Sequence, residues 1–145
     1  MPAVFQYPHT VTSEEIDGLG HAGNVVYVGW MQDAAFAHST AQGWPPERYI
    51  ESGVGWVVRS HQVEYLQPAW EGERVIVQTW VADFQKISSR RRYRIFRNDE
   101  EGETVLATAE TNWVYIGLER RIPRRIPPEL SGAFVVVDPE EEPGG

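Results

Sequence analysis

The sequence contains no cysteine, and this absence excludes several kinds of chemistry. Without a thiol, the chain can form no disulfide, offer no cysteine nucleophile and build no thiolate metal site. No HExxH motif or similar spacing of histidines and carboxylates occurs either. We therefore expect neither a bound metal nor a resident cofactor.

Long apolar runs are also missing. No run approaches the roughly 18 residues that a membrane-spanning helix requires, so we expect no membrane span. The start of the chain, MPAVFQYPHT, has no basic segment followed by an apolar one, so the sequence predicts no secretory signal and favours a cytoplasmic location. With 145 residues, 41% hydrophobic and 23% charged, the composition is that of a soluble single domain with a real core.

Positive charge is scarce overall but concentrated locally. The net charge of -8 argues against general nucleic-acid binding. Of the 13 Lys and Arg residues, however, six lie in 86–97 and four in 120–125. Two interpretations stay open, namely a local anionic partner such as the phosphates of a nucleotide-like ligand, or a solvated strand face with salt bridges between subunits.

The most informative stretch runs from Asp17 to Gly43, where a glycine-rich loop leads into the one long predicted helix. No proline occurs between Asn24 and Pro45, and Gly43 stands where a helix would end. At the helix start, unpaired N–H groups and the positive end of the helix dipole would lie near the Asp17 carboxylate. This combination suits acyl transfer, which needs a base or nucleophile beside a stabilised oxyanion. The alternative is that Asp17 only caps the helix and the glycines only form a tight turn.

Alternating apolar and polar residues predict one strand before this loop and four long strands after the helix. The predicted strands are 3–12, 53–67, 74–86, 88–98 and 103–118, with a short helical turn at 47–52. Long strands joined by short turns form an antiparallel meander, and only the long helix is available to cover its apolar face. We therefore predict an α+β fold in which a curved sheet wraps around one helix. The open sheet edges and second face favour dimers and tetramers.

One domain is expected over residues 1–130. From residue 119 the chain is rich in proline, and we expect it to begin by following the surface. The acidic Pro/Gly tail at 131–145 should end in disorder at EEEPGG, because this composition buries little apolar surface.

Two segments, DGLGHAGNVVYVGWMQDAA at 17–35 and HQVEYLQPAWEGERVIVQTWV at 61–81, resemble the hotdog-fold acyl-CoA thioesterases. The pattern is similar to the 4-hydroxybenzoyl-CoA thioesterase and acyl-CoA thioester hydrolase group, and the resemblance covers roughly residues 5–130. It implies a hotdog fold, a homodimer that often assembles into a homotetramer, and active sites at the subunit interface. The implied reaction is metal-free hydrolysis of an acyl-CoA, or of an acyl-carrier-protein thioester, to the free acid and the thiol.

The resemblance also implies roles for the loop. Asp17 matches the catalytic carboxylate, acting as nucleophile or as general base for water. Backbone N–H groups at 23–25, chiefly those of Asn24 and Val25, match the oxyanion donors, and the Asn24 side chain could touch the thioester carbonyl or the acid. His21 would orient the loop or line the site, or it is a structural histidine bonded to backbone.

Substrate contacts are implied more loosely. Lys86, Ser88 and Arg90 stand at the junction of two strands where the family places groups that contact CoA, and charge-assisted contacts to phosphate suit the two basic residues. Tyr27 could line either an aromatic-acyl pocket or a fatty-acyl tunnel.

Other histidines and acids have competing interpretations. His38 falls on the apolar arc of the helix, which favours a core or interface histidine over a catalytic one. His61 and Glu64 have opposite strand parity and should face opposite ways, so Glu64 is either a second acid reached across a dimer or a surface residue.

Two other functions stay open. One is a non-catalytic protein that binds acyl or CoA groups. The other is a hydratase or dehydratase on the same fold, although the spacing from Asp17 to His21 does not match that class well.

Overall fold

The computed structural model describes residues 3–144. The strands are β1 (Phe5–Thr10), β2 (Val54–Tyr65), β3 (Arg74–Phe84), β4 (Ser88–Asp99) and β5 (Gly102–Gly117). The α-helices are α1 (Asn24–Ala41), α2 (Pro46–Glu51) and α3 (Pro128–Ser131), and the 3₁₀ helices are η1 (Ser13–Glu15) and η2 (Pro139–Glu141). The long predicted helix is confirmed as α1, and Gly43, with a φ of 91°, supplies the left-handed residue just beyond its end.

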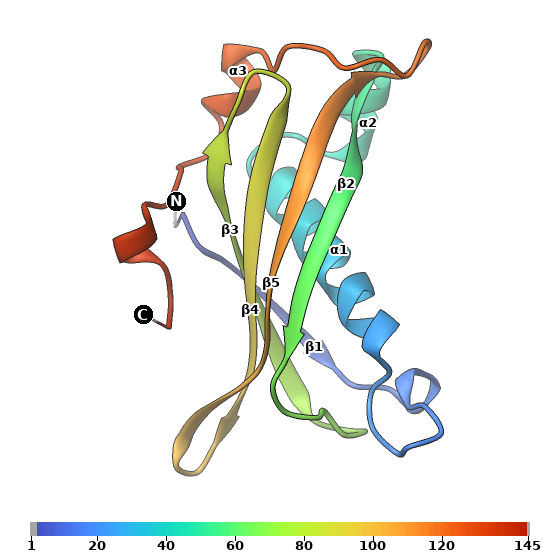
Figure 1. Cartoon of the computed structure of the whole chain (residues 1–145), viewed down its shortest axis with the longest axis vertical. Coiled ribbons are helices and arrows are strands. Elements are labelled where there is room, and N and C mark those ends of the chain that lie inside the picture. Colours follow the sequence, from blue (N-terminus) through green and yellow to red (C-terminus); the bar gives the residue numbers. More distant parts are fainter. Residues whose placement is uncertain (1–2, 145) are drawn as a thin grey trace.

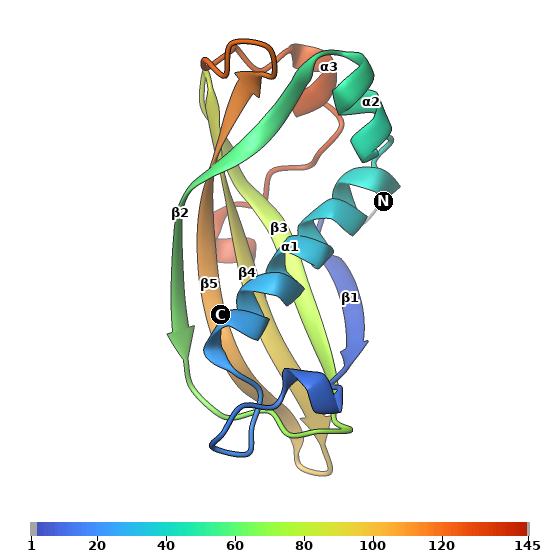
Figure 2. The same cartoon turned by 90° about the vertical axis from the view of Figure 1, so that its right-hand side faces the viewer.

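The five strands form one antiparallel sheet in the order β1-β3-β4-β5-β2. The long strands β3, β4 and β5 make the central meander, and β2 lies at the edge beside β5 (Figure 1). Helix α1 lies across one face of the sheet, which curves around it (Figure 2). The predicted α+β hotdog architecture is therefore confirmed.

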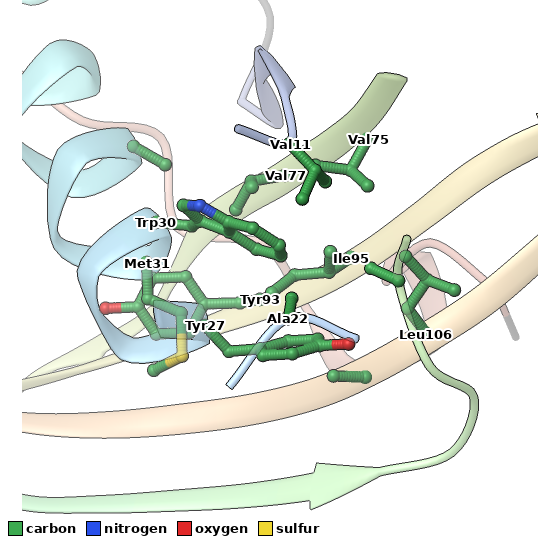
Figure 3. Packing of buried hydrophobic residues seen from close by; sticks show 13 residues of the cluster. Val11, Ala22, Tyr27, Trp30, Met31, Val75, Val77, Tyr93, Ile95 and Leu106 are labelled. Carbon is green, nitrogen blue, oxygen red and sulfur yellow. The ribbon is translucent and has the colours of Figure 1, made fainter. Parts of the chain in front are cut away.

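The first hydrophobic core lies between the N-terminal half of α1 and the sheet (Figure 3). Odd-numbered residues of β3 and β4 face the helix, because successive side chains in a strand point to opposite faces. The buried residues of this first core include Tyr27, Trp30, Met31 and Ala34 from α1 and Val75, Val77, Tyr93, Ile95 and Leu106 from the sheet. This packing holds the start of α1 at one end of the sheet.

A second core lies at the other end of the sheet, and the C-terminal segment supplies part of it. Ile126, Leu130 and Phe134 recur every four residues and are buried there with residues of β2, β3 and β5. The segment is also tied by backbone hydrogen bonds, from Ile126 N–H to the Lys86 carbonyl at 2.8 Å and from Val137 N–H to the Val81 carbonyl at 3.0 Å. Residues 126–137 thus belong to the folded body.

The end of the chain differs from the predicted disorder at 140–145. Glu142 accepts hydrogen bonds from Trp80 Nε1 at 3.0 Å and from Arg92 Nη1 at 2.6 Å. Both partners have even numbers, so they lie on the sheet face opposite α1. The basic strand face attracts this acidic tail, an interaction that composition alone does not show; Gly145 lies outside the described residues.

Candidate active site

The loop before α1 closes on itself through its backbone. The Asp17 N–H donates to the His21 carbonyl at 2.9 Å, and the Gly20 N–H donates to the Asp17 carbonyl at 3.1 Å. Gly20 has a φ of 92°, which explains why glycine suits this turn. The loop therefore presents Asp17 in a defined, exposed position beside the start of α1.

The two carboxylate oxygens of Asp17 have different surroundings. Oδ1 accepts the Leu19 N–H at 2.8 Å, as expected when an aspartate stabilises its own turn. Oδ2 has no hydrogen-bond donor among residues 3–144, and a Cβ placed on Gly23 would lie 3.9 Å from it. The turn-forming role of Asp17 is therefore real, and it leaves one oxygen free beside the helix terminus.

The first turn of α1 offers two unpaired donors. The Gly23 N–H, included in the predicted donor range, donates to the Glu15 carbonyl at 3.0 Å and is therefore not free. The N–H groups of Asn24 and Val25 have no acceptor in the part of the chain that the structure describes. They point from the positive end of the helix dipole, an arrangement that binds anions.

A cavity of about 270 Å³ opens between the start of α1 and the end of β2. Its lining residues are His21, Ala22, Asn24, Tyr27, Tyr65, Leu66, Gln67 and Pro68. The Tyr65 hydroxyl donates to the Asn24 carbonyl at 2.7 Å, and its ring meets the Tyr27 ring edge-on at 5.1 Å. Three of the predicted site residues, His21, Asn24 and Tyr27, thus line one cavity. Asp17 is not in its lining, and the link to it is Gly23, where a Cβ would lie 3.9 Å from Asp17 Oδ2.

His21 has a defined orientation in this cavity. Its Nδ1 lies 3.1 Å from the Ala22 carbonyl, which requires Nδ1 to carry the proton, and its ring meets Trp70 edge-on. Nε2 is then the acceptor nitrogen. Both predicted roles, a backbone-bonded histidine and a residue that lines the site, are compatible with this geometry.

Glu15 anchors the loop, and we did not single it out from the sequence. Its carboxylate accepts hydrogen bonds from His9 Nε2 at 2.8 Å, Trp30 Nε1 at 2.8 Å and the Thr12 N–H at 2.9 Å. Burial alone would raise the pKa of Glu15, but the hydrogen bonds from His9, Thr12 and Trp30 outweigh it and hold the pKa below its ordinary value. The pattern T-x-x-E at 12–15, typical of a capping box, was the available signal.

The predicted CoA contacts lie at the other end of the same subunit. Lys86, Ser88 and Arg90 belong to the β3–β4 hairpin, whereas Asp17 lies near the start of β3, one strand length or roughly 35 Å away. Arg90 is held by Asp83 at 2.6 Å, which together with the backbone hydrogen bond helps to lower the pKa of Asp83 despite its burial. One subunit therefore does not bring these residues to Asp17.

His38 is a core residue, and burial together with the neighbouring Arg91 lowers its pKa to about 3. His61 lies 2.8 Å from the Thr111 hydroxyl, and burial lowers its pKa. Glu64 is exposed and points to the sheet face opposite α1, as its parity predicts. Neither His38 nor Glu64 approaches Asp17 within the subunit.

Among residues 3–144, no group of three or more His, Asp or Glu side chains is arranged to hold a metal ion. Nor does any helix in this range have the length and apolarity to cross a membrane.

Comparison with known families shows to which family the chain belongs. The family model of the thioesterase-like superfamily matches residues 11–134. This chain belongs to the thioesterase-like superfamily. The match includes the Asp17 loop, α1 and the whole meander, so the resemblance predicted from the residues is confirmed.

One curated thioesterase resembles the chain over most of the chain's length. The palmitoyl-acyl carrier protein thioesterase, chloroplastic, of Arabidopsis thaliana is 30% identical over 147 residues, which cover 94% of this chain and 35% of that protein. The chain thus spans about a third of the length of this curated relative.

Two solved structures share the fold. Slr0204, a 1,4-dihydroxy-2-naphthoyl-CoA thioesterase from Synechocystis, has a TM-score of 0.80 and 20% identity, covering 90% of this chain and 94% of that one. The protein SAV2348 from Staphylococcus aureus, solved in complex with CoA, has a TM-score of 0.81 and 20% identity, covering 90% of this chain and 80% of that one.

Proposed function

We propose that this protein hydrolyses an acyl-CoA thioester to the free acid and CoA. The observation that carries the proposal is the free Oδ2 of Asp17 beside two unpaired N–H donors at the start of α1. The named activity of the Synechocystis protein and the CoA complex of the S. aureus protein support CoA as the carrier. The Arabidopsis relative makes an acyl-carrier-protein thioester the alternative substrate.

In the proposed mechanism, the thioester carbonyl lies between Asp17 and the helix start. Asp17 either attacks the carbonyl carbon or removes a proton from an attacking water, and the carbonyl oxygen becomes an oxyanion. The N–H groups of Asn24 and Val25 stabilise that oxyanion, a contribution of about 3–4 kcal/mol per donor in comparable sites. The bond to sulfur then breaks and CoA leaves as a thiolate. Where Asp17 is the base, the product is the free acid and the proton on Asp17 passes to the thiolate. Where Asp17 is the nucleophile, water hydrolyses the acyl-aspartate anhydride, which releases the free acid and restores the carboxylate. Tyr27 and His21, which line the adjacent cavity, contact the bound substrate.

A homodimer would complete the site. In the part of the chain that the structure describes, β2 pairs only with β5, which leaves its other edge open, and the exposed apolar residues Phe36 and Val57 lie on α1 and β2. The two ends of β2 differ, because Val54 pairs with Gly117 near the β3–β4 hairpin end while Tyr65 bonds to Asn24 at the catalytic loop. If two β2 edges pair antiparallel, the hairpin of one subunit comes to the loop end of its partner.

This arrangement gives the predicted CoA contacts a role. Lys86, Ser88 and Arg90 of one subunit would serve the Asp17 site of the other, although they are remote from their own Asp17. Two such dimers would assemble further through the second faces of their sheets to give the tetramer that the resemblance implies.

The test is hydrolysis of short-chain, long-chain and aromatic acyl-CoAs by the purified protein, followed by thiol detection. Asp17→Asn removes the base or nucleophile with little change of shape, and Asp33→Asn, an exposed acid on α1, is the matched control. We expect turnover of one acyl class by the parent and by Asp33→Asn, and turnover lowered by about 10²–10⁴-fold in Asp17→Asn. Normal turnover by Asp17→Asn would overturn the mechanism.

A second candidate is a non-catalytic acyl-CoA-binding protein. The hydrogen bond from Leu19 N–H to Asp17 Oδ1 favours it, because it shows that Asp17 already has a structural task. The same panel separates the two, since this candidate predicts saturable binding of CoA esters with no release of thiol by any variant.

A further inference from the structure

Arg91 is a buried cation without an acidic partner. It is 6% exposed, and its Nη1 donates to His38 Nδ1 at 2.9 Å and to the Thr79 hydroxyl at 3.1 Å. No carboxylate lies within 4.0 Å of its guanidinium in the described chain. The other arginines of β4 each form an ion pair, namely Arg90, Arg92, Arg94 and Arg97.

The neighbours of Arg91 do not neutralise it. His38 accepts from Arg91 through Nδ1, so it is an uncharged imidazole there, and its pKa of about 3 keeps it uncharged near neutral pH. The Phe134 ring, 5.9 Å from the guanidinium carbon, offers only a weak cation–π contact. Burial of a charged guanidinium without a counter-ion is unfavourable, and the group has donor capacity left for an anion.

Arg91 lines a small cavity between α1 and the sheet. This cavity measures about 50 Å³, and Phe36, Ser39, Tyr49 and Trp56 also line it. The same four residues line a second cavity of about 310 Å³, so the two cavities adjoin. The remaining lining of the larger cavity is apolar: Trp44, Pro46, Ile50, Val54, Gly55 and Leu118. We call the joined cavities the Arg91 trough.

The lining residues place the trough between the surface near α2 and Arg91. Ile50, 67% exposed, lies at the surface end of the trough, and the charged guanidinium of Arg91 lies at its buried end. Within one subunit the trough is also separate from the catalytic loop, because Ser39 lies fifteen residues after Asn24 along α1, or about 22 Å.

We propose that the Arg91 trough binds a carboxylic acid with an apolar body, with the carboxylate against Arg91 and the hydrocarbon along the apolar walls. A carboxylate is planar and accepts two hydrogen bonds from a guanidinium, and its single charge balances that of Arg91. The described chain places no second cation in the lining, so a doubly charged phosphate would be left uncompensated. The inner cavity has room for a group of a few heavy atoms, since about 10–15 Å³ of such space holds one water.

Two sources could supply this chemistry. One is a free monocarboxylic acid, which is also the class of product that thioester hydrolysis releases. The other is an acyl thioester that carries a second carboxylate at its far end. The binding site itself does not rest on hydrolysis by Asp17, so it is tested by direct binding.

The probe is decanoic acid, with decan-1-ol as its uncharged analogue, titrated into the full chain. Calorimetry and the fluorescence of Trp44 and Trp56, which line the trough, report binding. Arg91→Met removes the charge and keeps much of the volume. Arg74→Met makes the same change at an exposed arginine near the start of β3, for which the described chain shows no ion pair, and is the control.

We expect decanoate to bind the parent and Arg74→Met with equal affinity. Its affinity for Arg91→Met should be at least about tenfold lower, as the loss of one charged contact implies. Decanol should bind all three proteins alike. Absence of saturable decanoate binding to the parent, or equal affinity in Arg91→Met, would overturn the proposal. If Arg91→Met does not fold, Ile50→Glu at the exposed mouth replaces it. That variant replaces part of the apolar wall with a charged side chain and should weaken the binding of decanoate and decanol alike, and unchanged affinity would refute the site.

Competition against bound decanoate, measured with Asp17→Asn, distinguishes a free acid from an acyl thioester as the natural ligand. Decanoyl-CoA is compared with the mono-CoA thioester of decanedioic acid. Preferential displacement by the carboxylated thioester assigns the trough to the far end of the acyl group, whereas displacement by neither assigns it to free acids. Both results support the Arg91 trough. A failure of hydrolysis would refute the proposed function while leaving decanoate binding as an independent measurement.

Discussion

Replacement of Glu15 by glutamine should loosen the catalytic loop. The Glu15 carboxylate accepts hydrogen bonds from three donors, and glutamine keeps only one acceptor oxygen while turning an amide N–H₂ towards the others. A hydrogen bond to a charged group is worth about 1.5–3 kcal/mol, so loss of one such bond and weakening of the others should lower the free energy of unfolding by roughly 2–3 kcal/mol.

Urea unfolding followed by tryptophan fluorescence measures this change. The neighbouring exposed Glu14 has no side-chain hydrogen bond in the described chain, so Glu14→Gln is a matched control that should cost less than about 0.5 kcal/mol. Glu15→Gln should also lower turnover, because Asp17 follows only two residues later. Equal stability of the two variants would refute the anchoring role.

The same residue predicts a pH dependence. The pKa of Glu15 in the folded protein lies below its ordinary value of 4.5, so its ionised form is favoured by folding. The stabilisation is therefore complete above about pH 4.5 and is lost as the pH falls through the folded-state pKa. In Glu15→Gln, the free energy of unfolding should fall less steeply as the pH is lowered. Unfolding curves at a series of acidic pH values measure this difference.

Three further predictions concern the helix start, the core histidine and the subunit interface. Gly23→Ala places a methyl group in ordinary contact with the Asp17 side chain, so the protein should fold with unchanged stability. The methyl group takes up space beside Oδ2 that water or substrate would use, so kcat should fall, and unfolding together with kcat measures both. The depressed pKa of His38 means that stability falls as pH drops from 6.5 towards 3, by up to about 1.4 kcal/mol per pH unit. His38→Gln keeps an acceptor for the neighbouring guanidinium and should flatten that slope, as unfolding at several pH values would reveal. Mixing Asp17→Asn subunits with Lys86→Ala/Arg90→Ala subunits should restore activity that neither shows alone, and no recovery would contradict a site shared between subunits.

The main architecture could be predicted because its signals are local. The proline-free stretch from Asn24 and the alternation along 74–118 specify a helix and a meander, and short turns leave little freedom in how the strands pair. The loop at Asp17 was also predictable, since its glycines and the following helix start are adjacent in sequence. Which N–H groups are free was less predictable. The Gly23 N–H donates to the Glu15 carbonyl, and the position of that carbonyl depends on tertiary packing.

Features that depend on distant contacts escaped prediction. The C-terminal segment reads as a polar tail, yet Phe134 and Leu130 fill the second core and Glu142 reaches a basic strand face. In the sequence, Arg91 is indistinguishable from the other arginines of a basic strand. Only the strand register and the position of His38 show that its charge is buried while its neighbours pair with acids.

The role of Asp17 is tested most directly by comparing kcat/KM and CoA-ester affinity for the parent, Asp17→Asn and Asp33→Asn on the best acyl-CoA of the panel. The account predicts that Asp17→Asn loses about 10²–10⁴-fold in kcat/KM, the usual contribution of a positioned base, with unchanged affinity, while Asp33→Asn matches the parent. A kcat/KM for Asp17→Asn equal to that of Asp33→Asn would contradict it.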